Sequence, residues 1–231
     1  MCCLCACCLW VPATALVGAA NEAYSAIRRH TVMIYRAQGA CSAAVVAQDL
    51  LLTAAHCTKA SEALRVIGYV ADKRYRVGDV EHFEEAPQAT DLALLKLVKP
   101  LQTTFSAPFL TARPVAIGDQ LIVVGYGLNA PNDGKTFGTA RMALVTVIRR
   151  SADSISLIDP RNQMLGPDEG NRVGSCNGDS GAPVFAVRGT PLLVGIVSRG
   201  DCRSYTDAVP LAPHMDWLAE ASLRLGSPLN P

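Results

Sequence analysis

The sequence predicts an all-β protein, and two observations lead to that prediction. Most apolar runs are short and rich in β-branched residues, and turn signals separate them at close intervals. Many short strands with frequent turns favour a barrel or sandwich over alternating strands and helices. A chain of 231 residues, 50% of them hydrophobic, can bury a large core. All-β barrels of this size often form a single domain.

The predicted strands are spread along the chain, and one helix closes it. The strands are expected at residues 31–35, 43–46, 64–70, 121–124, 144–148, 183–187 and 192–197. The turn signals between them include Gly39, the run Pro131-Asn132-Asp133-Gly134, Pro160, Gly166-Pro167 and Arg188-Gly189. Residues 212–225 carry apolar positions at helical spacing, and Gly226 follows as a stop signal. We therefore expect a C-terminal helix after the last strand.

Composition and charge argue against two classes of partner. The net charge is +1 and no basic cluster is present, so nothing in the sequence favours nucleic acid. No apolar run reaches the 18 residues of a membrane-spanning helix. We expect a protein that binds neither nucleic acid nor a membrane through a spanning segment.

The nine cysteines fall into two groups. Five lie within the first eight residues, and the other four, Cys41, Cys57, Cys176 and Cys202, are spread through the body of the chain. Their even number and dispersal suit two disulfides and an oxidising compartment. Four cysteines allow three pairings, and the residues alone leave these open, as they leave open the alternative of buried free thiols.

Residues 1–15 are expected to be a signal peptide. Residues 2–11 are apolar, and Ala13-Thr14-Ala15 is the small-x-small pattern that signal peptidase cleaves. The segment departs from the usual pattern because no Lys or Arg precedes the apolar stretch, and the stretch is short. The expected location of the mature protein is secreted or periplasmic.

One string offers a nucleophile in a glycine-flanked turn. Hydrolysis of an amide by nucleophilic catalysis needs a hydroxyl, a base, a carboxylate that orients the base, and N–H donors for the oxyanion. In Gly178-Asp179-Ser180-Gly181, Ser180 supplies the hydroxyl. Gly178 has no Cβ, so its N–H can point the same way as that of Ser180 and form an oxyanion hole with it. Taken alone, the string could also be an ordinary polar turn.

A histidine and an aspartate complete the set. His56 follows the apolar run at residues 50–52, and Asp91 precedes another apolar run. Either residue alone would more often be structural or solvated. Together with Ser180, in the chain order His, Asp, Ser, they closely resemble the trypsin/chymotrypsin family of serine proteases.

The resemblance extends from about residue 16 to residue 225. Residues 123–127 (Val-Val-Gly-Tyr-Gly), 195–200 (Gly-Ile-Val-Ser-Arg-Gly) and 215–218 (Met-Asp-Trp-Leu) are similar to family segments. The resemblance implies two six-stranded antiparallel β-barrels with a C-terminal helix. The N-terminal barrel would span about 16–110, and the C-terminal barrel and helix about 111–231. The implied disulfides are Cys41–Cys57, which would staple the histidine loop, and Cys176–Cys202, which would brace the specificity pocket.

The resemblance also assigns roles to residues. Ser180 would be the nucleophile, His56 the general base and then acid, and Asp91 the group that fixes the imidazole tautomer. The N–H groups of Gly178 and Ser180 would hold the oxyanion. Ser198 would hydrogen-bond near Asp91, and the backbone of residues 198–200 would pair with an extended substrate. The implied partners are protein or peptide substrates of a monomeric enzyme, with no metal and no cofactor.

The segment Leu16-Val17-Gly18-Ala19 stands close to where the family carries its newly formed N-terminus. The resemblance implies that a Leu16 ammonium pairs with Asp179. Because Ala13-Thr14-Ala15 directly precedes Leu16, we hypothesise that signal peptidase cleavage itself releases the active enzyme. Alternatively, the end of the signal peptide merely looks like this motif, and cleavage after Ala20 would give a start at Asn21.

The expected specificity is not that of trypsin itself. The pocket floor should lie at Gly174, six residues before Ser180, where trypsin-like enzymes carry an acid. Strict preference for Lys or Arg is therefore not expected. Arg199 replaces the usual aromatic residue, and the short segment after Cys202 brings Arg203 near the pocket, where a cation would favour acidic side chains. The alternative is that both arginines face solvent.

The function predicted from the sequence is that of a secreted serine endopeptidase that works through an acyl-enzyme. Two other functions stay open. The chain could be a catalytically silent binding module on the same fold, although such proteins usually lose a triad member. It could also be a single-turnover or ester-specific hydrolase.

Overall fold

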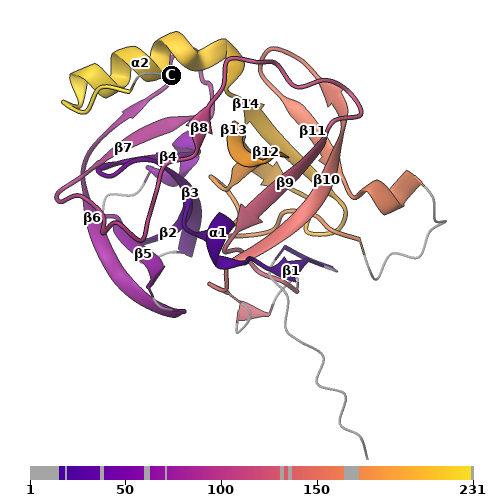
Figure 1. The fold of residues 1–231 in the computed structure, drawn as a ribbon. Helices are drawn as coiled ribbons and strands as arrows, with labels where there is room; N and C mark the ends of the chain where they lie inside the picture. Colours follow the sequence, from indigo (N-terminus) through magenta and orange to yellow (C-terminus); the bar gives the residue numbers. More distant parts are fainter. Residues whose placement is uncertain are drawn as a thin grey trace, which may run out of the picture.

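The chain folds into two closed antiparallel β-barrels of six strands each, side by side (Figure 1). The computed structural model describes residues 16–18, 20–36, 39–59, 63–70, 72–130, 133–134, 137–163 and 172–229. Its strands confirm the predicted all-β class and the two-barrel arrangement. The predicted signal peptide, residues 1–15, lies outside the described residues.

The first barrel closes in the strand order β2-β3-β4-β7-β6-β5. Its strands are β2 (Thr31–Arg36), β3 (Gly39–Ala47), β4 (Leu50–Thr53), β5 (Arg65–Val70), β6 (Lys73–Glu85) and β7 (Ala93–Leu97). Helix α1 (Ser25–Arg28) precedes it, and the 3-10 turn η1 (Ala55–Cys57) follows β4. His56 lies in η1, so the first barrel positions the predicted base.

The second barrel closes through β9-β10-β11-β14-β13-β12, with β12 pairing back to β9. Its strands are β9 (Gln120–Gly125), β10 (Arg141–Arg150), β11 (Ile155–Ile158), β12 (Pro183–Arg188), β13 (Thr190–Gly200) and β14 (Tyr205–Pro210). The short strands β1 (Asn21–Glu22) and β8 (Phe109–Leu110) add to β10 and β13, and the 3-10 turn η3 (Pro160–Gln163) follows β11.

The C-terminal helix is shorter than the predicted 212–225. The 3-10 turn η5 (Ala212–His214) comes first, with Pro213 near its start, and α2 (Met215–Arg224) follows. Figure 1 shows α2 lying over the first barrel, although the helix follows the last strand of the second. The Arg224 guanidinium binds the Glu84 carboxylate at 2.7 Å, which ties the two together. No helix in the described part of the chain is long and apolar enough to span a membrane.

Three hydrophobic clusters explain why some strands are apolar on both faces. One fills each barrel, and the third lies between the barrels and under α2. In β4, Leu51 points into the first barrel, whereas Leu50 and Leu52 join the cluster between the barrels, and all three are fully buried. Side chains of a strand alternate between its faces, so an unbroken apolar run is required where both faces are covered. The segments that follow β4 and precede β7 therefore lie where the barrels meet.

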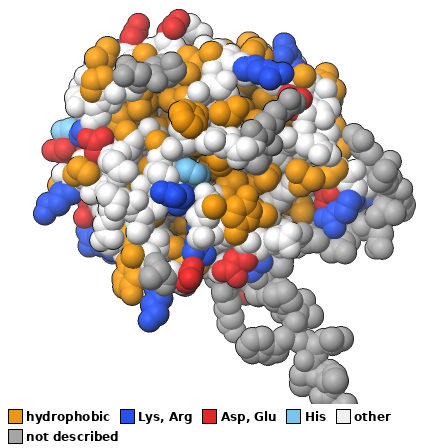
Figure 2. Space-filling model, viewed as in Figure 1, with side chains coloured by type: hydrophobic (Ala, Val, Ile, Leu, Met, Phe, Trp, Pro, Cys, Tyr) orange, Lys and Arg blue, Asp and Glu red, His pale blue; other side chains and the backbone are white. Residues whose placement is uncertain are grey.

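The surface carries charges of both signs. On the face drawn in Figure 2, acidic and basic side chains are interspersed and do not gather into a patch of one sign. Hydrophobic and uncharged side chains occupy most of the middle of this face.

Candidate active site

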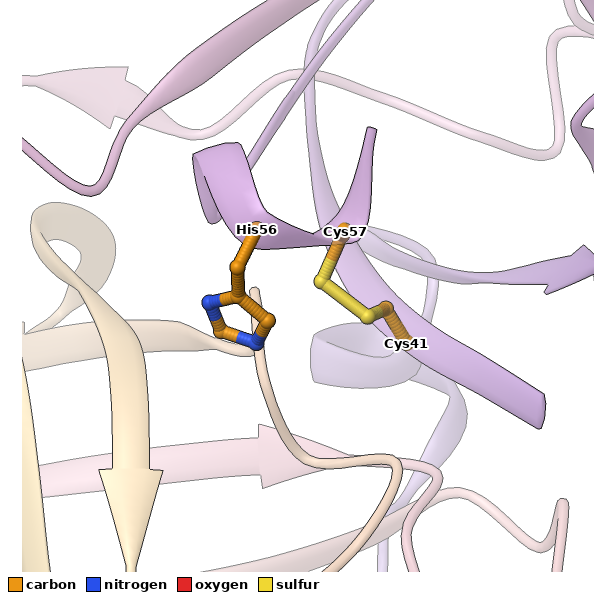
Figure 3. Close-up of side chains that lie close together, drawn as sticks. All are labelled: Cys41, His56 and Cys57. Atoms are coloured by element: carbon orange, nitrogen blue, oxygen red, sulfur yellow. A yellow bond between two sulfur atoms is a disulfide. The ribbon is translucent and has the colours of Figure 1, made fainter. Parts of the chain in front are cut away.

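The turn η1 presents His56 directly after β4. A disulfide between Cys57 and Cys41 fastens this turn to β3, as Figure 3 shows. The imidazole lies beside the disulfide, and the His56 side chain is 39% exposed. The histidine is thus held by its backbone while its ring stays accessible.

Asp91, two residues before β7, holds the imidazole from one side. Its carboxylate accepts hydrogen bonds from the His56 backbone N–H at 3.0 Å and lies 2.9 Å from His56 Nδ1. A third bond comes from the Ser198 hydroxyl at 2.6 Å. Burial alone would raise the pKa of Asp91, but the hydrogen bonds from His56 and Ser198 outweigh it and lower the pKa to about 2. Asp91 is therefore ionised at neutral pH and directs the Nδ1 proton toward itself.

Ser198 joins the two barrels at this point. The register between β13 and β14 shifts between Val197 and Arg199, so Ser198 sits in a β-bulge. Bulges often re-aim a side chain next to a functional site. Here the hydroxyl of Ser198 reaches Asp91, and its carbonyl accepts the hydroxyl of Ser180 at 3.3 Å. Asp91 and Ser180 thus both bond to one residue, which brings the predicted triad together.

The hydroxyl of Ser180 is directed at the Ser198 carbonyl, and among the described residues this oxygen is its only hydrogen-bond partner. Proton transfer to His56 requires the hydroxyl to turn toward the imidazole. Rotation about the Cα–Cβ bond of the serine achieves this without moving the backbone. Catalytic hydrogen bonds often align only when substrate is bound.

Ser180 follows a tight turn with a defined peptide orientation. Residues 176–179 form a β-turn, closed by a hydrogen bond from the Asp179 N–H to the Cys176 carbonyl at 3.0 Å. Gly178 occupies its third position with φ +97°, the left-handed conformation that a type II turn needs there. A side chain at Gly178 would also collide with Phe137, 2.4 Å from the position of its Cβ. The positive φ and the nearby Phe137 ring together account for glycine at position 178.

The amides of Gly178 and Ser180 are free to bind an anion. The Asn177 carbonyl accepts a bond from the Leu128 N–H at 2.8 Å. In a trans peptide the C=O and the N–H point in opposite directions, so the Gly178 N–H faces away from Leu128. No described residue accepts a hydrogen bond from the N–H of Gly178 or of Ser180. Such unused donors are what an oxyanion hole supplies.

The Asp179 side chain lies in the interior of the protein. It is fully buried, and its carboxylate accepts bonds from the N–H groups of Gly127 at 2.8 Å and Cys176 at 3.0 Å. A Cβ on Gly125 or Gly127 would lie 2.1 or 2.5 Å from this carboxyl group, which explains the Gly-Tyr-Gly string of the sequence. No described cation pairs with Asp179, and burial raises the pKa of its carboxyl to about 7.

Leu16 and Val17 dock beside this loop. Leu16 is 1% exposed and packs in the core of the second barrel, and Val17 forms an antiparallel bridge with Gly174. The φ of Leu16 is +54°, a left-handed conformation that costs a non-glycine residue roughly 1–2 kcal/mol. Because φ is defined by the preceding carbonyl, a chain that begins at Leu16 does not carry this strain.

Both expected disulfides are present. Cys41–Cys57 closes the histidine loop, and Cys176–Cys202 joins the segment before Ser180 to the segment after β13, with Cα atoms 4.3 Å apart.

Cys41, His56 and Cys57 also form a compact group of potential metal ligands (Figure 3). The two sulfurs are bonded to each other and leave no thiolate, so we assign no metal to this group.

The edge of β13 next to the triad is open. Pairing between β12 and β13 ends at Ile196, and the last bonds on that side join Val197 to Gly181 and Ala182. Apart from the Ser198 carbonyl, which accepts the Ser180 hydroxyl, no described backbone group pairs with residues 198–200 along this edge, as strand addition by a peptide requires. A groove of about 450 Å³ lies beside it, bordered by Asp91, Ser198 and Arg199.

At the predicted specificity pocket, backbone groups of the two walls lie close together. A Cβ on Gly200 would lie 2.1 Å from the Ser175 carbonyl oxygen, which also accepts the Cys202 N–H at 3.0 Å. Behind them the hydroxyls of Ser175 and Thr206 bond to each other at 2.8 Å in the interior. At the expected floor, a Cβ on Gly174 would lie 2.6 Å from the Ser204 nitrogen. Gly200 approaches Ser175, and Gly174 approaches Ser204, too closely to leave a deep specificity pocket between them.

The two arginines take different positions. The Arg199 side chain is 79% exposed, and its Nε binds the Asp207 carboxylate at 3.1 Å. The backbone of Arg203 lies against Gly174, while the residue is exposed. The sequence did not identify Asp207 as the partner of Arg199, because the pairing depends on the register of β13 with β14.

Sequence reasoning also missed Ser42. It lies in β3, directly after Cys41, and is fully buried. Its hydroxyl and its N–H contact the loop that carries Ser180. The available signal was a polar residue within a run of alanines and valines, which is unexpected for a strand buried on both faces.

Comparison with known proteins agrees with this geometry. Residues 17–218 match the sequence model of the family described as Trypsin. The chain is 30% identical to the vitellin-degrading protease of Bombyx mori over 187 residues, covering 73% of this chain and 69% of that protein. It is 26% identical to human kallikrein-15, covering 80% and 82% of the two chains.

A solved structure shares the fold. Mouse neuropsin, described as a serine protease expressed in the limbic system of the brain, superposes with a TM-score of 0.69. The superposition covers 87% of this chain and 98% of that one, at 17% sequence identity. Since the family match spans most of the chain and the barrels close as the family's do, this protein belongs to the trypsin family of serine proteases.

Proposed function

We propose that the protein is a secreted serine endopeptidase that cleaves peptide bonds through an acyl-enzyme, with Ser180, His56 and Asp91 as its triad. The observation that carries the proposal is the hydrogen-bonded chain from His56 through Asp91 and Ser198 to Ser180. A binding module would not need free N–H groups at Gly178 and Ser180 beside an ionised Asp91.

Each residue has a role in the proposed reaction. Ser180 Oγ attacks the scissile carbonyl while His56 Nε2 takes the proton, because Asp91 keeps the other ring proton on Nδ1. The N–H groups of Gly178 and Ser180 bind the oxyanion. The imidazolium then gives its proton to the leaving amine, which departs as the acyl-enzyme forms. Water, deprotonated by His56, attacks that ester and releases the acid and Ser180.

The substrate is proposed to bind as an extra strand on residues 198–200, which leaves its side chains to the groove beside Arg199. The enzyme would act as a monomer on proteins or peptides, with no metal or organic cofactor. Two disulfides suit an oxidising compartment, so the proposed location is secreted or periplasmic.

Labelling with a fluorophosphonate tests the proposal. Such a probe phosphonylates a serine only when a base and an oxyanion hole are assembled around it. We expect a chain that begins at Leu16 to be labelled and Ser180→Ala to remain unlabelled. A folded wild-type protein that is not labelled would contradict the proposal and favour the binding module. Labelling together with ester cleavage, but without peptide turnover, would favour the ester-specific or single-turnover hydrolase.

The close approach of the pocket walls predicts a preference for small side chains at the residue that precedes the cleaved bond. A peptide library with that residue varied should give alanine a kcat/KM at least about 10-fold above phenylalanine, lysine or glutamate, since each methylene that a pocket must reject is worth about 10-fold or more. The reason is the contact of Gly200 with Ser175. A preference for glutamate that Arg203→Ala removes would instead support the acidic specificity.

A further inference from the structure

We infer that Ser42 is a positioning residue that holds the oxyanion loop of the second barrel on the first barrel. This inference rests on the function proposed above. It adds a residue whose side chain lies outside the triad and outside the substrate groove.

The hydroxyl of Ser42 bridges two backbone groups of the second barrel. It donates to the Gly178 carbonyl at 2.9 Å and accepts from the Tyr126 N–H at 3.0 Å. The Ser42 side chain is fully buried, so water cannot replace either bond. Buried backbone groups are almost always paired, and here one hydroxyl pairs two of them.

The backbone of Ser42 adds two more contacts. Its N–H donates to the Ser180 carbonyl at 2.7 Å, and its carbonyl accepts the Thr53 hydroxyl at 2.8 Å. Thr53 ends β4, three residues before His56. Ser42 therefore bonds to the carbonyl groups of Gly178 and Ser180, the residues on either side of Asp179, and is tied to the strand that leads to His56.

These contacts fix the direction of the oxyanion donors. In the Gly178–Asp179 peptide, the carbonyl accepts the Ser42 hydroxyl and the N–H donates to the Cys176 carbonyl of the turn. In the preceding peptide, the Asn177 carbonyl accepts the Leu128 N–H. Without the Ser42 hydroxyl, the Gly178 carbonyl loses its partner and the glycine can change ψ at little steric cost. The Gly178–Asp179 peptide lies between the two peptides that carry the oxyanion donors, so its rotation would shift the Ser180 N–H relative to the Gly178 N–H, which Leu128 still holds. An oxyanion hole works because its donors are already in place when charge develops.

The chain offers a matched control in Ser222. This residue is also fully buried, and its hydroxyl donates to the Ala219 carbonyl at 2.7 Å and accepts the Leu229 N–H at 2.9 Å. It lies in α2, on the far end of the chain from the site. Ser222→Ala removes the same chemistry as Ser42→Ala at a place that contacts none of the triad.

The experiment measures fluorophosphonate labelling as a function of probe concentration, because the saturation curve separates reversible affinity from the rate of bond formation. For Ser42→Ala we expect the rate of bond formation to fall about 10- to 100-fold, somewhat less than the loss of a whole oxyanion donor. Reversible affinity should stay within about 3-fold. Ser222→Ala should lower the urea midpoint but leave both constants unchanged.

If Ser42→Ala does not fold, Ser42→Cys carries the test, since cysteine has the same branching as serine and its thiol is only a weak donor. Its rate of bond formation should fall at least about 3-fold with reversible affinity kept. A rate equal to that of Ser222→Ala in the folded variant overturns the inference. A wild-type protein that is not labelled contradicts the proposed function instead, so the two failures are distinguishable.

Discussion

Asp91→Asn is expected to lower kcat for peptide hydrolysis by about 10⁴-fold at neutral pH while KM changes little, the size that a carboxylate-to-amide change has in the Ser-His-Asp template. The asparagine can keep the bond from the His56 backbone N–H, but it can present its NH₂ group to Nδ1. The imidazole then carries its proton on Nε2 and cannot accept one from Ser180. Initial rates and burst kinetics on the best library peptide measure this change.

Asp49→Asn is the matched control for this substitution. Asp49 also lies in the first barrel, and its carboxylate accepts bonds from Lys96 at 2.5 Å and from the Ser227 hydroxyl at 2.6 Å. Its side chain is 25% exposed, against 24% for Asp91. Asp49→Asn should change stability without changing kcat. Equal loss of kcat in both variants would show that Asp91 acts through folding alone.

The barrels could be predicted from the sequence because strands and turns are local. Runs such as residues 121–124 and 192–197 coincide with β9 and β13, and the resemblance supplied the closure of both barrels. The C-terminal helix was predicted too long at its start, since Pro213 favours a 3-10 turn before α2. The candidate triad was found because each residue stands in a short, recognisable string.

The rest of the site depends on contacts between segments that are remote in sequence. The Ser42 hydroxyl meets Gly178 across 136 residues, and Ser198 meets Asp91 across 107. Neither the bulge that aims Ser198 nor the approach of Gly200 to Ser175 has a signal in local propensity. Such features follow from how two closed barrels pack, which no single strand specifies.

The second large effect concerns the N-terminus. A chain that begins at Leu16 should hydrolyse peptides about 10²- to 10³-fold faster than a chain that begins one residue earlier, at Ala15. The physical reason is that Asp179 is a buried carboxylate with no described cation beside it, and an unpaired buried charge costs about 3–5 kcal/mol. An ammonium at Leu16 would pair with it and keep the oxyanion turn in place, whereas one extra residue displaces that charge. Matched kcat values for the two chains would contradict this pairing.

The pH dependence of stability gives an independent reading of the same pair. Without a cation, burial raises the pKa of Asp179 in the folded chain from 3.8 to about 7. The unfolding free energy is therefore highest below about pH 3.8, where the carboxyl is protonated in both the folded and the unfolded chain, and it falls as the pH rises through 7. Each pKa unit corresponds to about 1.4 kcal/mol, and the unfolding free energy of the Ala15 chain should fall by on the order of 4 kcal/mol over this window. The Leu16 chain carries a protonated amine throughout this window and should show little of this fall.

Asp179→Asn should remove the pH dependence of the unfolding free energy from the Ala15 chain. In the Leu16 chain, the same substitution should lower activity as much as the added residue does. If Asp179→Asn leaves the Leu16 chain fully active, the ammonium has another partner. Cleavage before Leu16 would then not assemble the site through Asp179.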